Sequence, residues 1–575
     1  MENLNFKQTA NFIWEIANLL RGDYKQSDYG KVILPLTVLR RLDCVLAPTK
    51  DQVLAHLPTL KSTPVQNIDP ILNRKAGLKF HNRSPYGFDN LIADPDNIAA
   101  NLRNYINGFS ENAREIIEYF DFDKQIDRLD KSNLLYLVIK RFQEVDMHPD
   151  TLSNVEAGYL FEELIRKFAE LSNETAGEHF TPREVIRLMV NLLFIADQNV
   201  LTQLGIIKTL YDPAGGTGGM LTVADEYVRE LNPDAQLRLF GQEINPESYA
   251  IFKADMLIKG NETNNIKFGN SFTEDGLPDE SFDYMLSNPP FGVSWKKVQK
   301  EIKREYEDLG FVGRFGAGLP RVSDGSLLFL QHMMSKRKTE GQGSRLAIVF
   351  NGSPLFTGNA GSGESEIRRW VFENDYLEAI IALPDQLFYN TGIATYIWIV
   401  DNKKSAERKG KVQLINAVSF FEKMSKSLGN KRHQISPEQI ATITQTYGDF
   451  SEGEYCKIFD TTDFGYHRIT VERPKRNEMG DPITDRKGNP KADSSLRDYE
   501  NIPLKEAIDS YFEREVLPHV PDAWIDPSKT KVGYEINFTR YFYEYTPLRS
   551  TAEIRADILK LKEDLAGLTL KAIDG

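Results

Sequence analysis

The sequence predicts an α/β protein whose core is a largely parallel, doubly wound sheet, with helical regions before and after it. Short apolar strands alternate with helices between residues 151 and 420, and this alternation is typical of such a sheet. A glycine-rich turn follows the first of these strands, and helical periodicity without a strand series fills the first 150 residues. We therefore expect three regions, at 1–150, 151–420 and 421–575, of which the last is mainly helical.

The elements follow from the apolar pattern in chain order. The first region contains amphipathic segments such as ANFIWEIANLLRG and VILPLTVLRRLDCVL, which predict helices. Two further helices, EAGYLFEELIRKFAEL and HFTPREVIRLMVNLLF, precede the first strand. The predicted strands are 206–213, 236–244, 282–287, 345–350, 377–383 and 394–400. Beyond residue 420 the strand pattern fades, and the polar stretch 475–498 predicts a long loop.

The C-terminal segment has one regular apolar period. Its apolar residues are spaced by four, three, four and three positions, which is the seam of a coiled coil; they are Ile554, Ile558, Leu561, Leu565 and Leu568. Two interpretations stay open: a terminal helix packed on its own domain, or a helix offered to a partner.

Composition excludes several classes of protein. With 41% hydrophobic and 27% charged residues, and no apolar run of about 18 residues, the chain is typical of a globular protein without a membrane span. The N-terminus predicts an amphipathic helix rather than a signal peptide, so we expect a cytoplasmic protein. Cys44 and Cys456 lack metal-site spacing, and we expect no metal. The net charge of −13 argues against a chain that wraps nucleic acid with its whole surface.

The glycine-rich turn DPAGGTGGM, at 212–220, lies where a doubly wound sheet binds a nucleoside. A triphosphate-binding loop would need Lys and then Ser or Thr after the last glycine, where this chain has Met220 and Leu221. Glu243 ends the next strand, where a carboxylate can accept hydrogen bonds from ribose hydroxyls. Together these features favour a nucleoside cofactor over a merely structural turn, and leave NAD and S-adenosylmethionine both open.

The turn SNPPFG, at 287–292, follows a strand on the same rim of the predicted sheet. Asn288, Pro289 and Pro290 offer oxygen acceptors that no helix or ladder uses, and Phe291 adds a ring on which a flat base can stack. Two fixed acceptors suit a planar amino group, and they would favour its attack on an electrophilic methyl group. In isolation the motif would be a rigid turn. Its place behind a cofactor loop favours the catalytic interpretation.

The motifs HFTP, DPAGGTGG, GQEINP and NPPF, in this order, resemble those of N6-adenine DNA methyltransferases that use S-adenosylmethionine. The longer context is similar to the methylation subunit of type I restriction–modification systems, a class of phage-defence enzymes. The stretches that carry this resemblance are 30–43, 177–185, 353–370 and 381–400. The resemblance implies a Rossmann-like, S-adenosylmethionine-dependent methyltransferase core.

The resemblance also implies roles for individual residues. The cofactor would be held by Glu178, His179, Phe180, Thr181, Pro182 and Arg183 at its methionine end, by Asp212, Ala214, Gly215, Gly216 and Thr217 near its centre, and by Glu243 at its ribose. Asn270 lies near the expected cofactor adenine, where many relatives carry Asp. The target adenine, flipped out of the duplex, would be held by Asn288, Pro289, Pro290 and Phe291. For His179, cofactor packing is the preferred interpretation over a general base.

The implied partners are double-stranded DNA, a separate specificity subunit, a restriction subunit with translocase and nuclease activity, and a second copy of this chain. The coiled-coil period would then dock on the specificity subunit. The segment 296–321 is basic in patches and suits DNA phosphates. Its acidic residues, Glu301, Glu305 and Asp308, leave a plain solvated helix as the alternative.

Two other functions remain open. A protein-glutamine methyltransferase shares the Asn-Pro-Pro chemistry, but that family typically has Tyr after the second proline and a much shorter chain. A non-catalytic scaffold that binds DNA or partners is the other alternative. If selection on catalysis had been lost, Asn288 or the glycines would be expected to change first. Both are intact in this sequence, which disfavours the scaffold.

Overall fold

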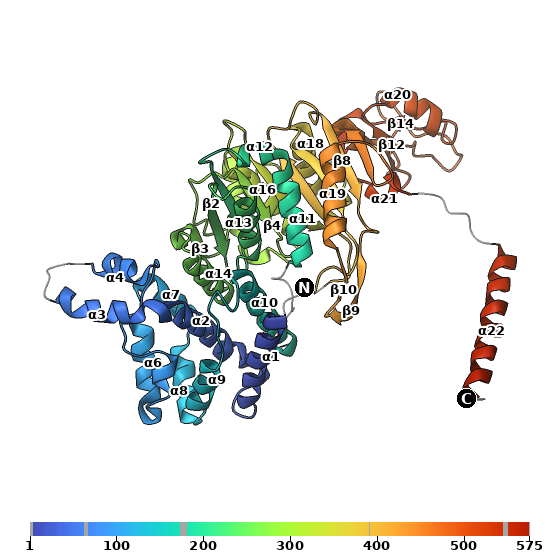
Figure 1. The fold of residues 1–575 in the computed structure, drawn as a ribbon. Coiled ribbons are helices and arrows are strands. Elements are labelled where there is room, and N and C mark those ends of the chain that lie inside the picture. The colour runs from blue at the N-terminus through green and yellow to red at the C-terminus, as the bar shows by residue number, and fades with distance from the viewer. Residues whose placement is uncertain (1–3, 62–66, 173–180, 390, 544–549, 574–575) are drawn as a thin grey trace. The chain divides into compact units, whose positions relative to one another are not determined.

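The computed structural model describes residues 4–61, 67–172, 181–389, 391–543 and 550–573. The chain divides into two compact units, residues 1–536 and 537–575. The first unit holds the helical region and the sheets, and the second holds α21 (Phe538–Tyr541) and α22 (Thr551–Ile573) (Figure 1). Over the residues described, no helix combines the length and the apolar character that crossing a membrane would need.

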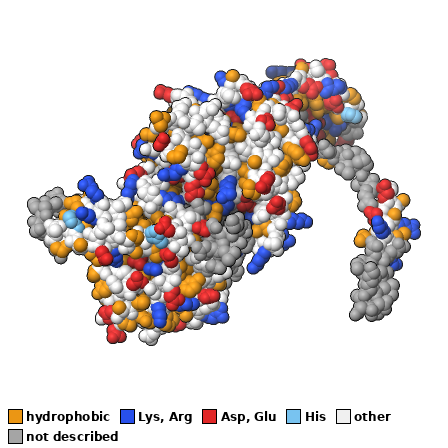
Figure 2. All heavy atoms as spheres, in the orientation of Figure 1, with side chains coloured by type: hydrophobic (Ala, Val, Ile, Leu, Met, Phe, Trp, Pro, Cys, Tyr) orange, Lys and Arg blue, Asp and Glu red, His pale blue; other side chains and the backbone are white. Residues whose placement is uncertain are grey.

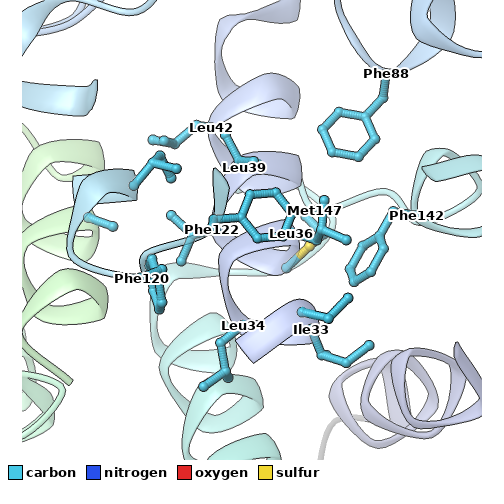
Figure 3. Close-up of a cluster of buried hydrophobic side chains, with 14 of the residues drawn as sticks. Ile33, Leu34, Leu36, Leu39, Leu42, Phe88, Phe120, Phe122, Phe142 and Met147 are labelled. Atoms are coloured by element: carbon cyan, nitrogen blue, oxygen red, sulfur yellow. The ribbon is translucent and has the colours of Figure 1, made fainter. Parts of the chain in front are cut away.

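The regular structure described before residue 150 is helical. The helices are α1 (Leu4–Leu19), α2 (Gly30–Leu46), α3 (Lys50–Lys61), α4 (Asp69–Ala76), α5 (Phe88–Leu91), α6 (Ile98–Asn107), α7 (Glu111–Glu118), α8 (Asp123–Lys131) and α9 (Leu135–Gln143). Helix α2 is apolar on nearly every side, as expected of a helix at the centre of a bundle. Figure 3 shows its Leu36 and Leu39 among Phe122, Phe142 and Met147, contributed by the surrounding segments.

The helical region shares its core with the α/β region. α10 (Asn154–Ser172) and α14 (Pro246–Ile258) both pack against α2, and Ala250, Ile251 and Ala254 of α14 belong to the same buried cluster as α2. Lys253 of α14 also forms an ion pair with Glu115 of α7, with 2.7 Å between Nζ and Oε2. Helix α14 is therefore anchored in the helical region.

The central sheet has nine strands in the order β11-β8-β6-β7-β5-β4-β1-β2-β3. The strands are β1 (Ile207–Asp212), β2 (Gln236–Glu243), β3 (Ile266–Phe268), β4 (Tyr284–Ser287), β5 (Arg345–Asn351), β6 (Leu377–Ala382), β7 (Thr395–Asp401), β8 (Lys411–Asn416) and β11 (Cys456–Asp460). Neighbours are parallel except that β7 is antiparallel to β5 and β6, and β11 is antiparallel to β8. The predicted largely parallel, doubly wound α/β class is confirmed.

Helices cover both faces of this sheet. α11 (Arg183–Phe194), α13 (Gly219–Leu231) and α19 (Pro437–Asp449) belong to one buried cluster with alternate residues of the strands, such as Leu210 and Leu239. α16 (Ser326–Ser335) lies on the other face, where its His332 contacts Tyr211. Neighbouring residues of one strand point to opposite faces, so Leu210 and Tyr211 pack under different helices.

The prediction of a mainly helical region from residue 421 onward is wrong. β9 (Glu422–Leu428) and β10 (Lys431–Gln434) form a hairpin, and β11 extends the central sheet. A separate antiparallel sheet follows, made of β12 (Gly465–Glu472), β13 (Asp498–Pro503), β14 (Trp524–Ile525) and β15 (Lys531–Tyr534). Several of these strands are short or polar, and they lack the apolar runs by which a buried strand is recognised.

The polar stretch 475–498 connects β12 to β13, and all but its last residue lies outside any strand. Its turns are closed by Asn and Asp side chains rather than by apolar contacts. Asn477 Oδ1 accepts from the backbone N–H groups of Met479 and Asp481, at 3.0 and 2.9 Å. Asp485 Oδ1 does the same for Lys487 and Asn489, at 2.7 and 3.0 Å. The predicted long loop is thus a pair of hydrogen-bonded turns on the surface.

Candidate functional site

A cavity of about 310 Å³ lies at the carboxyl ends of β1, β2 and β4. The chain runs outward from β1 to β3 and then returns to β4 on the other side of β1, so the strand order reverses at this point. Open α/β sheets bind their ligands at such a reversal. The predicted site residues that line the cavity are Thr181, Asp212, Ala214, Gly215, Gly216, Thr217, Glu243, Asn270, Asn288 and Pro290.

The glycine loop is shaped by one buried ring beneath it. A Cβ atom built on Gly215, Gly218 or Gly241 would lie 2.6, 2.4 or 2.6 Å from the ring of Phe252, which is fully buried in α14. Gly218 also has φ of +85°, a conformation that favours glycine. The loop therefore lies directly on Phe252, and its Gly215, Gly216 and Gly219 line the cavity.

Glu243 ties the second strand to the glycine loop. One of its carboxylate oxygens accepts from Gly216 N–H at 2.8 Å, and the other accepts from Asn245 N–H at 2.7 Å. Each carboxylate oxygen can accept more than one hydrogen bond. Glu243 is buried and lines the cavity, so its remaining acceptor capacity is available to a ligand's hydroxyl groups.

Asp212 ends β1 and is almost fully buried. Its Oδ1 accepts from Ala214 N–H at 2.9 Å and from the Ser287 hydroxyl at 3.1 Å. Burial raises the pKa of this carboxyl to about 7, and the nearby Glu243 charge adds to the rise, although the two hydrogen bonds oppose it. Asp212 thus changes charge near neutral pH beside the cavity.

Asn288 is held in one orientation by Thr181. The Asn288 Nδ2 group donates to Thr181 Oγ1 at 2.9 Å, while Asn288 Oδ1 is buried and has no hydrogen-bond partner within the described part of the chain. A buried polar atom without a partner is unfavourable in a folded protein and calls for an explanation. Both residues line the cavity, so a ligand's N–H group could supply the missing donor.

The remaining predicted residues that the structure describes lie around the cavity rather than in its wall. Phe291 packs edge to face on Phe388, with ring centroids 6.0 Å apart, and Pro289 is buried. Arg183 donates to Glu162 Oε1 at 2.9 Å and lies over the ring of Tyr159, while Pro182 precedes it at the start of α11. Glu178, His179 and Phe180 lie outside the described residues.

The cavity also contains residues that the sequence analysis did not identify. Glu162 of α10 is one, and burial raises the pKa of its carboxyl. An aromatic wall is another: Phe272 and Phe329, with ring centroids 4.5 Å apart, line the cavity together with the buried Trp295. Trp295 follows the Asn-Pro-Pro turn closely in the sequence. An aromatic residue just past that turn could therefore have been predicted to line the cavity.

One arginine fixes this aromatic wall. Arg314 donates to the backbone carbonyls of Ser271 and Phe272, at 2.8 and 2.6 Å, and pairs with Glu305 at 2.6 Å. Glu305 belongs to α15 (Gln299–Leu309), which lies in the predicted DNA-contacting segment 296–321. Arg314 therefore joins that segment to the cavity.

The described residues contain no group of three or more His, Cys, Asp or Glu side chains suited to a metal ion.

The fold and the cavity together define a Rossmann-like methyltransferase, since a doubly wound sheet carries a glycine loop, the buried carboxylate of Glu243 and an Asn-Pro-Pro-Phe turn on one rim. The chain belongs to the N-6 DNA methylase family, whose model matches residues 153–466, and the HsdM N-terminal domain model matches residues 9–142. The interpretation as an N6-adenine DNA methyltransferase of the type I methylation-subunit class is confirmed.

Curated relatives agree with this assignment. The type I restriction enzyme MjaIX methylase subunit of Methanocaldococcus jannaschii is 25% identical over 470 residues, which cover 78% of this chain and 79% of that one. The HindI methylase subunit of Haemophilus influenzae is 29% identical over 56% of this chain and 66% of its own. The EcoKI methylase subunit of Escherichia coli is 26% identical over 57% and 60%.

Solved structures share the fold. The methyltransferase subunit of a type I restriction–modification system from Streptococcus thermophilus aligns with a TM-score of 0.62 and 22% identity, covering 80% of this chain and 97% of its own. A modification subunit of a putative type I restriction enzyme from Vibrio vulnificus aligns with a TM-score of 0.53 and 18% identity, covering 85% and 97%.

Proposed function

We propose that the chain transfers a methyl group from S-adenosylmethionine to N6 of a flipped-out adenine in double-stranded DNA, as the modification subunit of a type I restriction–modification complex. The observation that carries this proposal is the buried Oδ1 of Asn288, which has no donor among the described residues, while Asn288 lines the cavity and Thr181 holds the other end of the amide. An exocyclic amino group of a base supplies the N–H donor that this oxygen lacks.

The cavity suits S-adenosylmethionine. Glu243 retains acceptors for ribose hydroxyls, the glycine loop presents backbone to the ligand's centre, and Asn270 with Phe272 forms a polar and aromatic wall for its base. Thr181 lines the cavity where the methionine end is expected. We also propose that Glu178 to Arg183 hold the methionine end of the cofactor.

The cofactor would supply an electrophilic methyl group bound to a positively charged sulfur. Asn288 Oδ1, with the carbonyl oxygens of the adjacent prolines, would accept hydrogen bonds from the adenine amino group and raise electron density on N6. Formation of the N6–CH3 bond would break the S–CH3 bond and leave its electron pair on the cofactor's sulfur. The methylated nitrogen then loses one proton to water, so the chain needs no strong base.

Duplex DNA hides N6 within the base stack, so we expect the target adenine to leave the duplex and to be held by the Asn-Pro-Pro-Phe turn. Sequence choice would come from a separate specificity subunit. α22 is one continuous helix, as its apolar period predicts, and its Ile554, Ile558 and Leu561 are exposed; the side chains of Leu565 and Leu568 lie outside the described residues. Such a helix suits coiled-coil docking on that subunit.

The other proposed partners are a second copy of this chain and a restriction subunit, because the relatives are named as methylase subunits of type I restriction enzymes. We propose a cytoplasmic location, where the DNA is. The exposed side chains of Lys300, Lys303 and Arg304 on α15 keep the segment 296–321 available for DNA phosphates.

Cofactor affinity is expected to rise between pH 6 and pH 8. A positive sulfonium favours the ionised form of Asp212, whose pKa of about 7 means that this form becomes dominant across that interval. A shift of one pKa unit corresponds to a factor of about ten in affinity. Calorimetric titration should show this rise for S-adenosylmethionine. It should be weaker for S-adenosylhomocysteine, whose sulfur is neutral, and absent for Asp212→Asn.

The same carboxyl affects stability with a defined sign. Because its pKa in the folded protein lies above that of an exposed carboxyl, its contribution to the free energy of unfolding is complete below about pH 4 and is lost as the pH rises through 7.

For the affinity prediction, a pH-independent affinity for both S-adenosylmethionine and S-adenosylhomocysteine would contradict the proposed placement of the sulfonium beside Asp212.

The function is tested by incubating the chain, alone and with its specificity subunit, with duplex DNA and methyl-labelled S-adenosylmethionine. Nuclease digestion and mass spectrometry then identify the modified base. N6-methyladenine that forms only with the partner is the expected result. Methyl transfer to protein glutamine would replace the proposal with the glutamine-methyltransferase alternative, and bound cofactor and partner without any transfer would favour the scaffold.

A further inference from the structure

The β9–β10 hairpin is a basic element on the surface of an acidic chain. Lys423, Lys426 and Arg432 are exposed, and none of them forms an ion pair with a carboxylate among the residues described. The whole chain has a net charge of −13. Figure 2 shows basic side chains at the lower edge of the sheet-containing part, where Figure 1 places this hairpin.

The hairpin is docked on the segment that follows β6 by its backbone. Asn430 N–H donates to the Tyr389 carbonyl at 2.9 Å, and the N–H groups of Arg432 and His433 both donate to the Gln386 carbonyl, at 2.9 and 3.2 Å. The ring of His433 adds a contact of 2.9 Å between Nδ1 and the Asp385 carbonyl. The hairpin is therefore held in a defined position.

A buried lysine attaches the hairpin to helix α11. Lys431 is 4% exposed and forms an ion pair with Glu184 in the first turn of α11. Its Nζ also donates to the carbonyls of Leu387 and His433, at 3.0 and 2.8 Å. A buried charge is tolerated when its donors are used in this way, so Lys431 serves the docking and not a ligand.

The docked hairpin is connected to the Asn-Pro-Pro-Phe turn on two sides. Glu184 lies three residues after Thr181, which holds the Asn288 amide. On the other side, Phe388 of the supporting segment packs on Phe291, with ring centroids 6.0 Å apart. The hairpin, its support and the Asn-Pro-Pro-Phe turn thus belong to the same rim of the sheet.

We propose that the β9–β10 hairpin binds DNA phosphates beside the flipped-out adenine, with Lys423, Lys426 and Arg432 as the contacting cations. The inference rests on the proposed function, because it needs DNA at this rim. Cations without protein partners are what a phosphate backbone attracts, and an acidic chain requires such a local patch to bring DNA to its catalytic face.

The composition of the hairpin favours DNA over a protein partner. Its exposed residues are all polar or glycine over the positions whose side chains are described, and Met424 is half-buried. Protein interfaces are enriched in aromatic residues and Met and depleted in Lys. A hairpin whose exposed cations are mainly Lys therefore fits a phosphate backbone better than a protein surface.

The test uses the triple variant Lys423→Gln, Lys426→Gln and Arg432→Gln in the assembled complex. DNA affinity is measured as a function of salt concentration. Each lost phosphate contact should lower the slope of log affinity against log salt by about 0.9, so the triple variant should lose between about two and three units of slope. KM for DNA should rise at least tenfold at moderate salt, while kcat at saturating DNA and S-adenosylmethionine affinity stay unchanged.

A matched control removes the same charges elsewhere. Arg74, Lys75 and Lys131 are exposed and have no ion pair among the residues described, and they lie at the ends of α4 and α8 in the helical region. The variant Arg74→Gln, Lys75→Gln and Lys131→Gln should keep the wild-type salt slope. Equal losses of slope in both variants would show a general effect of net charge and overturn the proposal.

The outcomes separate this inference from the proposed function. The salt slope needs DNA binding but no turnover, so wild-type binding without methyl transfer would refute only the proposed function. A hairpin variant with wild-type slope and KM would refute only the hairpin contact. Loss of subunit assembly with an unchanged slope would identify the hairpin as a protein-docking surface instead, and would also overturn the proposal.

Discussion

Asn288→Ala is expected to lower kcat for methyl transfer by about 10²–10³-fold, the range measured when one preorganised hydrogen-bonding group is removed from a catalytic site. The orphaned Oδ1 of Asn288 is the acceptor that would strengthen its interaction as N6 attacks. Cofactor affinity should change by less than threefold, because the glycine loop and Glu243 keep their contacts. Single-turnover methylation and calorimetric titration measure the two quantities separately.

Thr181→Val provides the companion variant. It preserves the shape of the side chain but removes the hydroxyl that accepts from Asn288 Nδ2 at 2.9 Å, so the amide is free to turn its nitrogen toward the cavity. We expect a loss of about tenfold in kcat, smaller than that of Asn288→Ala, since a positioning contact is lost rather than the acceptor itself. Full activity in Asn288→Ala would remove the basis of the proposed function.

Gly218→Ala is expected to abolish measurable cofactor binding while the helical region stays folded. The new methyl group would lie 2.4 Å from the Phe252 ring at a residue with φ of +85°. Left-handed strain costs about 1–3 kcal/mol and overpacking of a buried ring about 1–3 kcal/mol. The loop must therefore move away from its seat on the ring. Cofactor titration and thermal unfolding followed by circular dichroism measure the effect.

The chain offers a matched glycine as control. Gly260 has φ of +73° and no atom within 4 Å of an added Cβ, so Gly260→Ala keeps the backbone strain without the clash. It should bind cofactor normally and lose only the strain contribution of about 1–3 kcal/mol of stability. The double variant Gly218→Ala with Phe252→Leu should recover part of the affinity. Equal losses in the two glycine variants would show that strain, and not the ring, governs the loop.

The sequence predicted the strands that bear on the cavity because each is a short, continuous apolar run between breakers. β1, β2 and β4 lie within the predicted ranges 206–213, 236–244 and 282–287. The carboxyl ends of these strands carry the motifs, so the cavity wall at Asp212, Glu243 and Asn288 could be predicted along with them. A buried strand needs apolar residues on both faces, and this requirement is visible in one sequence.

What could not be predicted depends on contacts between distant residues. β13 has mostly exposed residues and β9 is largely polar, since each is stabilised by its partner strand rather than by burial. Glu162 reaches the cavity from a helix that precedes the sheet, and its place there is set by the ion pair with Arg183. Nothing in the local pattern of these three segments specifies these pairings.

The ring of Phe252 beneath the glycine loop changes what the glycines mean. Gly215, Gly218 and Gly241 are each required by the packing of a buried side chain, whether or not a ligand is ever bound. A relative that had lost methyl transfer would still need all three to keep this packing on the ring, whereas no packing contact requires the free oxygen of Asn288. Inactive members of such a family should therefore be sought by substitutions at position 288. Intact glycines show that the loop can pack on the ring, but they do not show that the protein transfers methyl groups.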